Sequence, residues 1–313
     1  MNSLDWYIRS QLKLRHLQLL VALDDLRNVG KVANYLHVSQ PAVSKSLSEL
    51  ENNIGLKLFQ RTAYGMQPTI YGSSLVMFSR KILAELGKAR DELRALVSGL
   101  EGKVSVGVLP GAAVVVLPEA ISQLKHESPV TGIAITEGNM GSLKPKLLSG
   151  EIEIIIGILP EDNHHADMEH ISLYQDKLVL VAGNKHPLAT KKNIGWHDLY
   201  HTSWILPPND SMTRQPIENE FRRHQLTLPT NYIESISTMV NVGILCQGNA
   251  IAFLPSAVAG YYVKQGMLAI LPTSVPKLRQ SVGILHMKSQ ALSPSARLFI
   301  ATLKNIYGCS KDI

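Results

Sequence analysis

Residues 37–55, "HVSQPAVSKSLSELENNIG", restrict the possible fold more than any other stretch of the chain. Their apolar side chains recur at steps of four and three residues, the spacing of one buried helical face: Val43, Leu47, Leu50 and Ile54. Ser39 is a favourable N-cap, and Pro41 falls in the first turn, where a missing N–H matters little. Gly55 suits a left-handed C-cap. The stretch therefore predicts a helix whose two ends are both specified locally.

The outward face of this predicted helix is small, polar and nearly uncharged, whereas an ordinary solvated helix usually carries more Glu and Lys. A recognition helix approaches base edges in a groove about 12 Å wide, which excludes bulky side chains near its start, and Pro41 keeps that start narrow. Gln40 can pair with base edges. Ser39 and Ser44 can hold phosphate together with the helix N-terminus, and Lys45 can do either. The pattern favours a helix that reads double-stranded DNA.

The flanking segments predict the rest of a small DNA-binding domain. "NVGKVANYLHV" predicts a preceding helix joined by a tight turn, as in a helix-turn-helix. After the quoted helix, "LKLFQRTAYGMQPTIYG" predicts two short extended pieces around the turn "AYGM", with Arg61 before the turn and Thr69 after it. Such a hairpin is a wing that contacts the DNA backbone or the minor groove. The alternative is a structural hairpin with a solvated Arg61, because any small helical domain can carry one.

A long amphipathic helix is predicted next. Positions 75, 79, 82, 86, 89, 93, 96 and 100 follow steps of four and three, and all are apolar except Ser79. A narrow apolar stripe that persists over about four heptads requires a partner helix. That partner can be another part of the same chain. We favour a second copy of the chain, because a DNA reader with two half-sites needs two reading heads.

From Lys103 onward the chain alternates between strand and helix patterns. "KVSVGVL", "GIAITEG", "IEIIIGIL" and "KLVLVAG" are short apolar runs typical of buried parallel strands, and helical stretches lie between them. A similar series recurs from "SWILPP" through "NYIES", "AIAFLP" and "QSVGILHM". The pattern predicts two α/β lobes with a crevice between them, where ligands bind at the carboxyl ends of the strands.

The positive charge is concentrated in the first third of the chain. Residues 1–100 contain 13 Lys and Arg against 8 Asp and Glu, which accounts for five of the six formal positive charges. Such a distribution is expected if this third meets a polyanion. Cys246 and Cys309 provide neither a disulfide framework nor a metal-binding spacing, as expected in a reducing cytoplasm. No apolar run approaches the roughly 18 residues that span a bilayer, so we expect no membrane partner.

Sequence motifs for catalysis are absent. The chain has no G-x-G-x-x-G after a strand, no Walker loop and no G-x-S-x-G elbow, and its histidines lack metal-ligand spacing. We therefore expect no enzyme, no metal and no cofactor other than a small-molecule coinducer. Two functions remain open: a ligand-responsive transcription factor, and a solute-binding or catalytic α/β protein with a helical appendage. The charge distribution, the narrow helix face and the heptads favour the first.

The order of these parts resembles the LysR-type transcriptional regulators over essentially the full length. The resemblance is most specific in "LRHLQLLVAL", in "VANYLHVSQPAVSKSLSELENNIGLKLFQRT" and in "PTIYG", and it continues in "LVLVAGNKHPLA" and "GNAIAFLPSAVA". It implies a winged helix-turn-helix at 1–72, a linker and dimerisation helix at 73–102, and a two-lobed periplasmic-binding-protein-like effector domain at 103–313. It also implies a homotetramer of two dimers in the cytoplasm that contacts RNA polymerase and responds to a small organic effector.

Carried over by position, the resemblance assigns DNA contacts to Gln40, Pro41, Ser44, Lys45 and Arg61, and the residue pattern of the helix start and the hairpin adds Ser39 and Thr69. Lys45 stands where many members have arginine. For the effector it implies a crevice lined by Pro110, Gly111, Ala112, Asn139, Ser142, Leu159, Pro160, Ser211, Met212, Thr213, Arg214 and Met239. Arg214 would suit an anionic effector.

The expected lobes are about 103–163 with 273–313, and about 164–272. They would be joined near residues 160–167 and again near residues 268–272, where a hinge could open and close the crevice.

Overall fold

The computed structural model describes residues 3–98, 102–160, 167–273 and 278–308. The chain forms two compact units, the first containing residues 1–94 and the second containing residues 95–147 and 152–313. No helix within the described ranges is long and apolar enough to cross a membrane.

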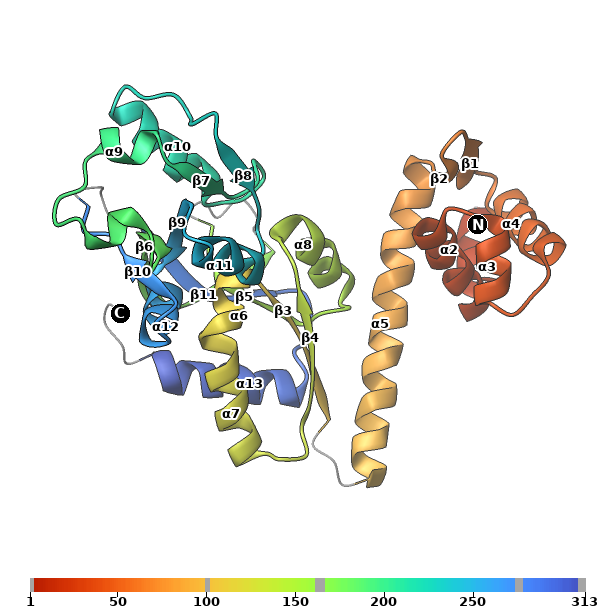
Figure 1. The fold of residues 1–313 in the computed structure, drawn as a ribbon. Helices are drawn as coiled ribbons and strands as arrows, with labels where there is room; N and C mark the ends of the chain where they lie inside the picture. The colour runs from red at the N-terminus through yellow and green to blue at the C-terminus, as the bar shows by residue number, and fades with distance from the viewer. Residues whose placement is uncertain (1–2, 99–101, 161–166, 274–277, 309–313) are drawn as a thin grey trace. The chain divides into compact units, whose positions relative to one another are not determined.

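The first unit is a helical domain with a small hairpin and a long final helix (Figure 1). Its elements are α1 (Ser3–Ser10), α2 (Leu14–Leu26), α3 (Val29–Tyr35), α4 (Gln40–Ile54), β1 (Phe59–Thr62), β2 (Gly65–Pro68) and α5 (Ile70–Ser98). The strands β1 and β2 pair antiparallel, with Arg61 opposite Met66. The winged helix-turn-helix that the sequence predicts is thereby confirmed.

The boundaries of α4 follow the local signals in the sequence. The Ser39 hydroxyl accepts a hydrogen bond from the Ala42 N–H, and Pro41 occupies the first turn. Gly55 ends the helix in the left-handed region with a φ of 77°, which glycine adopts without a steric penalty. The four predicted apolar residues of α4 are all buried in one core with side chains from α2, α3 and the start of β1. Packing and capping therefore agree along this helix.

The helix α5 carries an exposed apolar face beyond its first turns. Ser79, the polar break in the heptad pattern, is buried and donates its hydroxyl hydrogen to the Leu75 carbonyl, so it fits the helix without facing water. By contrast, Ile82, Leu86 and Leu93 are exposed in the single chain. Position 100 lies outside the described residues, and burial at position 96 is not described.

The second unit contains a sheet that runs through two lobes. Its strands are β3 (Lys103–Val108), β4 (Gly132–Glu137), β5 (Ile154–Ile158), β6 (Met168–Gly183), β7 (Ser203–Leu206), β8 (Tyr232–Glu234), β9 (Ala250–Pro255), β10 (Leu268–Ile270) and β11 (Arg279–Met287). The order is β4-β3-β5-β11-β6-β9-β7-β8, with β10 paired to β6. The first half of β6 pairs with β11, and its second half pairs with β9 and β10. One strand thus belongs to both lobes.

Helices cover both faces of each lobe. They are α6 (Pro110–Val114), α7 (Val116–Glu127), α8 (Met140–Ser149), α9 (Trp196–Tyr200), α10 (Arg214–Arg223), α11 (Thr238–Cys246), α12 (Ser256–Lys264) and α13 (Pro294–Tyr307), with a 3₁₀ turn at Pro187–Thr190. In the first lobe α7 and α13 lie together on one face (Figure 1). In the second lobe, Leu178 and Leu180 pack with α9 and α10, while Val179 and Val181 pack with α11 and α12. Alternate side chains of β6 therefore point to opposite faces of the sheet and contribute to two separate hydrophobic cores.

The crossing between the lobes differs from the sequence expectation. Instead of crossing in the segment 160–167, most of which lies outside the described residues, the chain crosses inside β6, between Lys177 and Leu178. The chain returns to the first lobe between β10 and β11, slightly later than the predicted crossing at residues 268–272. The physical reason is that residues 168–177 already pair with β11. Charged side chains interrupt the apolar pattern there, so the sequence indicated a strand only from "KLVLVAG" onward.

Candidate functional site

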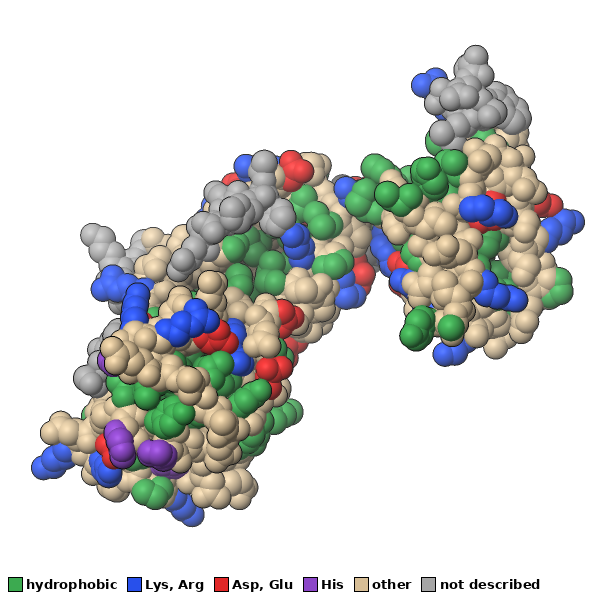
Figure 2. Space-filling model, turned by 90° about the horizontal axis from the view of Figure 1, so that it is seen from above, with side chains coloured by type: hydrophobic (Ala, Val, Ile, Leu, Met, Phe, Trp, Pro, Cys, Tyr) green, Lys and Arg blue, Asp and Glu red, His purple; other side chains and the backbone are tan. Residues whose placement is uncertain are grey.

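The start of α4 presents an exposed polar surface on the first unit. Gln40, Pro41, Ser44 and Lys45 are exposed, and Lys45 has only a long ion pair of 3.9 Å with Glu49. Basic side chains predominate on the face of this unit seen in Figure 2. Exposed side chains at a helix N-terminus combine hydrogen-bonding groups with the positive end of the helix dipole. The arrangement can accept a phosphate and present an amide to a base edge.

Gly30 makes room for the Gln40 amide. A Cβ at position 30 would lie 2.8 Å from the Gln40 Nε2 and 3.2 Å from the Asn28 Oδ1. Asn28 is the N-cap of α3, since its side chain accepts a hydrogen bond from the Lys31 N–H. A larger residue at position 30 would displace the amide. The glycine in "RNVGKVA" is therefore fitted to the glutamine at the start of the next helix.

The hairpin is fastened to α4 by a buried carboxylate. Glu51 is 5% exposed, and its Oε1 accepts hydrogen bonds from the N–H groups of Leu58 (2.9 Å) and Phe59 (3.1 Å). Its Oε2 lies 2.6 Å from the Lys57 Nζ. Burial alone would raise the pKa of Glu51, but the hydrogen bonds from Lys57, Phe59 and Leu58 outweigh burial and lower it. This carboxylate fixes where the wing leaves the recognition helix.

A second anchor holds the other strand of the hairpin. The Arg27 carbonyl accepts a hydrogen bond of 2.8 Å from the Met66 N–H. Gly65 has a φ of 97°, and a Cβ there would lie 2.3 Å from that same carbonyl oxygen, so only glycine fits. The Arg27 guanidinium also donates to Gln67 and pairs with Asp24. The wing is thus tied to α2 as well as to α4.

The structure places the two predicted wing residues differently. Arg61 is exposed on β1 beside the reading helix. The Thr69 hydroxyl donates to the Lys57 carbonyl (2.7 Å) and accepts from the Gly72 N–H (3.1 Å), so it caps the start of α5. Those contacts make the Thr69 hydroxyl a structural cap, and a DNA contact by Thr69 stays a prediction. Tyr64, 87% exposed at the hairpin tip, is a surface residue that the sequence reading had not singled out.

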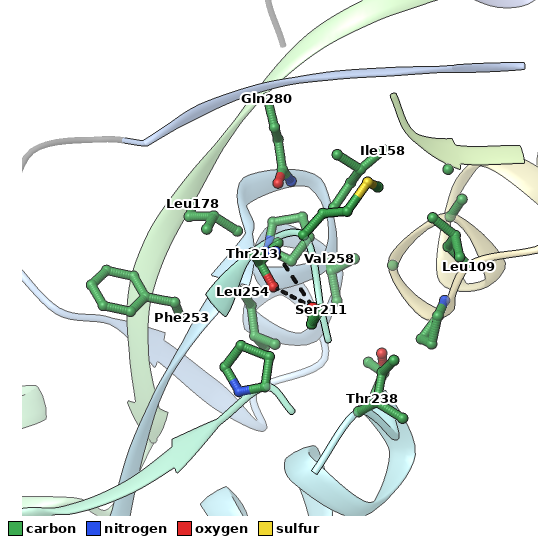
Figure 3. A pocket seen from close by; sticks show the side chains of 18 of the residues that line it. Leu109, Ile158, Leu178, Ser211, Thr213, Thr238, Phe253, Leu254, Val258 and Gln280 are labelled. Atoms are coloured by element: carbon green, nitrogen blue, oxygen red, sulfur yellow. Dashed lines mark hydrogen bonds between the residues drawn. The ribbon is translucent and has the colours of Figure 1, made fainter. Parts of the chain in front are cut away.

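A cavity lies between the two lobes of the second unit (Figure 3). Its volume is about 140 Å³, well above the roughly 10–15 Å³ that a single water molecule needs. The first lobe and β6 contribute Leu109, Pro110, Gly111, Ala112, Asn139, Met140, Ile158, Tyr174 and Asp176. The second lobe contributes residues that include Ser211, Met212, Thr213, Ser235, Thr238, Asn241, Leu254 and Val258. Such a space suits a small organic molecule.

Seven predicted effector residues line this cavity: Pro110, Gly111, Ala112, Asn139, Ser211, Met212 and Thr213. Ser211 and Thr213 are hydrogen-bonded to one another at 2.9 Å (Figure 3). Asn139 Nδ2 donates to Asp210 Oδ2 at 3.3 Å, a contact between the lobes. A Cβ on Gly111 would lie 3.3 Å from Pro255, so the start of α6 closely approaches the second lobe.

Arg214 does not face the cavity. It is 5% exposed, donates to the Pro207 carbonyl at 2.7 Å, and pairs with Glu218 at 2.7 Å and with Glu234 at 3.7 Å. A buried guanidinium is stable only with such partners, because the desolvated charge must be compensated. The expectation that Arg214 would bind an anionic effector is therefore corrected.

Four other predicted residues lie outside the cavity lining: Ser142, Leu159, Pro160 and Met239. Ser142 lies in the first turn of α8, where Asn139 caps the helix: the Asn139 Oδ1 accepts from the Ser142 N–H, and the Asn139 carbonyl accepts from the Ser142 hydroxyl. Leu159 is buried at the end of β5, where its N–H donates to the Ser281 carbonyl. Met239 is 80% exposed on α11. The register of the strands and the rotation of α11 decide these positions, and neither is readable from spacing alone.

Sequence reasoning missed several polar residues of the lining, among them Asp176, Asn241 and Gln280. Figure 3 shows the Gln280 side chain reaching into the cavity. The pKa of Tyr174, which also lines the cavity, is raised first by burial and then by the negative charges of Asp176 and Glu119. Tyr174 is therefore a neutral phenol. No signal in the sequence marks Asp176, because it precedes the apolar run "KLVLVAG" from which a strand is indicated.

Comparison with known proteins gives consistent matches over the whole chain. The family model described as LysR substrate binding domain matches residues 98–307, and that described as bacterial regulatory helix-turn-helix protein, lysR family, matches residues 14–73. The transcriptional regulator GbpR of Azospirillum brasilense is 32% identical over 301 residues, covering 96% of this chain and 88% of GbpR. The transcriptional regulator GalR of Pseudomonas putida is 29% identical, covering 93% of this chain and 73% of GalR.

A solved structure shares the complete architecture. The crystal structure of CbnR, a LysR family transcriptional regulator, matches with a TM-score of 0.70 and 19% identity, covering 95% of this chain and 99% of CbnR. This similarity concerns the fold, whereas the family matches concern the sequence. The chain belongs to the LysR family of transcriptional regulators, DNA-binding proteins with an effector-binding domain.

Proposed function

We propose that this regulator reads its operator with the start of α4 and the β1–β2 wing, and that a small organic effector in the cavity between the lobes controls that binding. The observation that carries the DNA assignment is the exposed, slim and polar helix start beside a wing that two internal anchors hold in place. The proposed contacts are Ser39, Gln40, Pro41, Ser44, Lys45 and Arg61. The Ser39 hydroxyl also caps α4, so the DNA contact that we propose for Ser39 is made by the backbone at the helix start.

The exposed apolar face of α5 supports a dimer. Ile82, Leu86 and Leu93 are large apolar side chains at heptad positions, and a stripe of this kind is buried when two such helices pair. We propose dimerisation through residues 75–100. A tetramer of two dimers and a contact with RNA polymerase in the cytoplasm rest on the family resemblance alone. We keep the proposed division into reading domain (1–72), linker helix (73–102) and effector domain (103–313).

The proposed effector site is the inter-lobe cavity. A molecule that contacts residues of both lobes can shift the protein between open and closed arrangements only by the difference in its affinity for them. Asn139 from the first lobe and Ser211 and Thr213 from the second are positioned for such contacts. The second lobe begins at Leu178 in this assignment, because the chain crosses inside β6.

The test of DNA reading uses operators isolated by sequencing the genomic fragments that the purified protein retains. Gln40→Ala should reduce discrimination between operator and mutated operators by about 1–3 kcal/mol, the usual contribution of one bidentate base contact. Arg61→Ala should weaken binding to all sequences and reduce the salt slope by about one. Gln265→Ala and Arg222→Ala, exposed on the second unit, are the matched controls. Wild-type binding by both reading-head variants would contradict the assignment.

A further inference from the structure

Several residues that line the cavity between the lobes have a buried polar atom without a hydrogen-bond partner. In the described part of the chain, five buried side-chain nitrogen or oxygen atoms have no hydrogen-bond partner: Asp176 Oδ2, Trp196 Nε1, Glu220 Oε2, Asn241 Oδ1 and Gln280 Nε2. Three of the five belong to residues that line the cavity. A folded protein rarely leaves buried polar atoms unpaired, and such atoms in a cavity indicate groups that a ligand completes.

Asp176 is the central member of this set. It is 3% exposed, and its Oδ1 accepts hydrogen bonds from the Ser256 N–H (3.1 Å), the Ser256 hydroxyl (2.5 Å) and the Lys177 N–H (2.7 Å). Three donors therefore converge on this one oxygen at the start of α12. Its Oδ2 is then an acceptor without a donor. Whatever completes it has to donate a hydrogen bond.

The other two unpaired atoms lie where they can act with Asp176. Gln280 on β11 is the direct cross-strand partner of Asp176 on β6, at the point where the chain crosses between the lobes. Asn241 comes from α11 of the second lobe and is 8% exposed. A side-chain amide can present either its oxygen or its NH₂ group, so these two residues can donate to or accept from the same molecule. The site therefore joins the crossing strands to the second lobe.

The charge of the cavity excludes the kind of effector that Arg214 had suggested. Asp176 and Asp210 both line it, and none of the described lining residues is Lys, Arg or His. An anionic molecule would lie near the buried Asp176, where solvent screening is weak, and near the exposed Asp210, with no cationic side chain of the lining to compensate them, which is unfavourable. Neutral or positively charged donors would meet a complementary surface.

We infer that the effector is a small molecule without negative charge, bearing hydroxyl or amino groups, and that it donates one hydrogen bond to Asp176 Oδ2 and exchanges others with Gln280 and Asn241. This inference rests on the proposed effector site. Because Asp176 Oδ1 also holds the start of α12, a donor at Oδ2 links the ligand to the second lobe through one side chain. Hydroxyl and amino compounds share this chemistry, and the experiment separates them.

The experiment measures the thermal unfolding of the full chain by fluorescence in a Trp6→Phe background, which leaves Trp196 and Trp204, both in the second lobe. The first probes are the anionic, neutral and cationic fractions of a bacterial metabolite extract separated by ion exchange. The second probes are two matched series: glucose, glucosamine and glucuronate, and benzyl alcohol, benzylamine and benzoate. A compound that binds the folded protein raises its unfolding temperature in proportion to how far its concentration exceeds its Kd.

We expect the neutral or the cationic fraction to raise the unfolding temperature, and the alcohol or the amine to exceed the acid in any series that responds. A response in the neutral fraction identifies hydroxyl donors, and one in the cationic fraction identifies amines. For the most stabilising compound, Asp176→Asn should weaken binding at least tenfold. Asp198→Asn, an exposed carboxylate paired with Lys191 outside the cavity, should leave it unchanged.

Asp176→Asn can also loosen α12, because Asp176 holds the start of that helix. Gln280→Met removes only the side-chain amide and is the second test. It should weaken binding several-fold. Stabilisation by the anionic fraction alone, or equal binding by the wild type and both cavity variants, would overturn the inference while the effector site itself survives. If no fraction changes the unfolding temperature of a protein that still binds operator DNA, the proposed effector site fails, and the inference fails with it.

Discussion

The contacts of Glu51 lead to a graded prediction about the stability of the DNA-binding unit. The N–H groups of Leu58 and Phe59 both donate to its Oε1, and these two residues are 1% and 5% exposed. Glu51→Ala removes the acceptor and leaves both N–H groups buried without a partner, at about 1–3 kcal/mol each. Lys57, whose side chain is 74% exposed, returns to water with little loss. We expect Glu51→Ala to lower the free energy of unfolding by about 2–4 kcal/mol.

Glu51→Gln separates the hydrogen bonds from the charge. Glutamine retains an oxygen at the same place, so both N–H groups keep an acceptor, and we expect a loss of only about 0.5–1.5 kcal/mol. Glu49→Ala, on the exposed face of the same helix, is the matched control and should stay within about 0.5 kcal/mol of the wild type.

The measurement is hydrogen exchange of peptides from residues 40–68 across a urea series, made in a Trp6→Phe background so that the fluorescence of Trp196 and Trp204 reports the second unit alone as an internal reference. The expected order of stability is wild type, then Glu51→Gln, then Glu51→Ala, with an unchanged fluorescence transition. If Glu51→Ala behaves like Glu49→Ala, the carboxylate does not hold the wing. If Glu51→Gln loses as much as Glu51→Ala, the charge rather than the N–H acceptor is responsible.

Three further outcomes are expected. The folded-state pKa of Glu51 lies below its ordinary value of about 4.5, so its contribution to the stability of the first unit is complete above that pH and is lost as the pH falls through the lower folded pKa. Glutamine does not titrate, so the urea midpoint of the first unit should fall less steeply with acid in Glu51→Gln than in the wild type. Replacing Leu86 and Leu93 by Lys should give monomers in light scattering and abolish operator binding, whereas Glu85→Gln on the same helix should stay dimeric; a dimeric double variant would disprove pairing through α5. Arg214→Met should destabilise the second lobe by about 1–3 kcal/mol in fluorescence-detected unfolding of the Trp6→Phe chain, because the Pro207 carbonyl and the partly buried Glu218 lose their donor; an unchanged midpoint would show that these contacts contribute nothing.

The sequence by itself determined the elements whose physics is local. The bounds of α4 follow from an N-cap serine, a first-turn proline and a C-cap glycine, each acting within a few residues. The hairpin and the long α5 follow in the same way from a turn between extended pieces and from a heptad stripe. The family resemblance then supplied the complete architecture, and the structure confirmed that fold.

Only the tertiary structure decided which polar groups meet in the cavity. Strand pairing puts Asp176 opposite Gln280 and brings Asn241 toward them from a separate helix, although nothing in the local pattern distinguishes these residues from solvated ones. The same packing turns Arg214 inward to Glu218 and Glu234 and removes the cation that its sequence position had suggested for the effector. Hydrogen bonds and charges act over a few ångströms in space, so residues distant in the sequence define the site, and the spacing of residues along one chain carries no record of them.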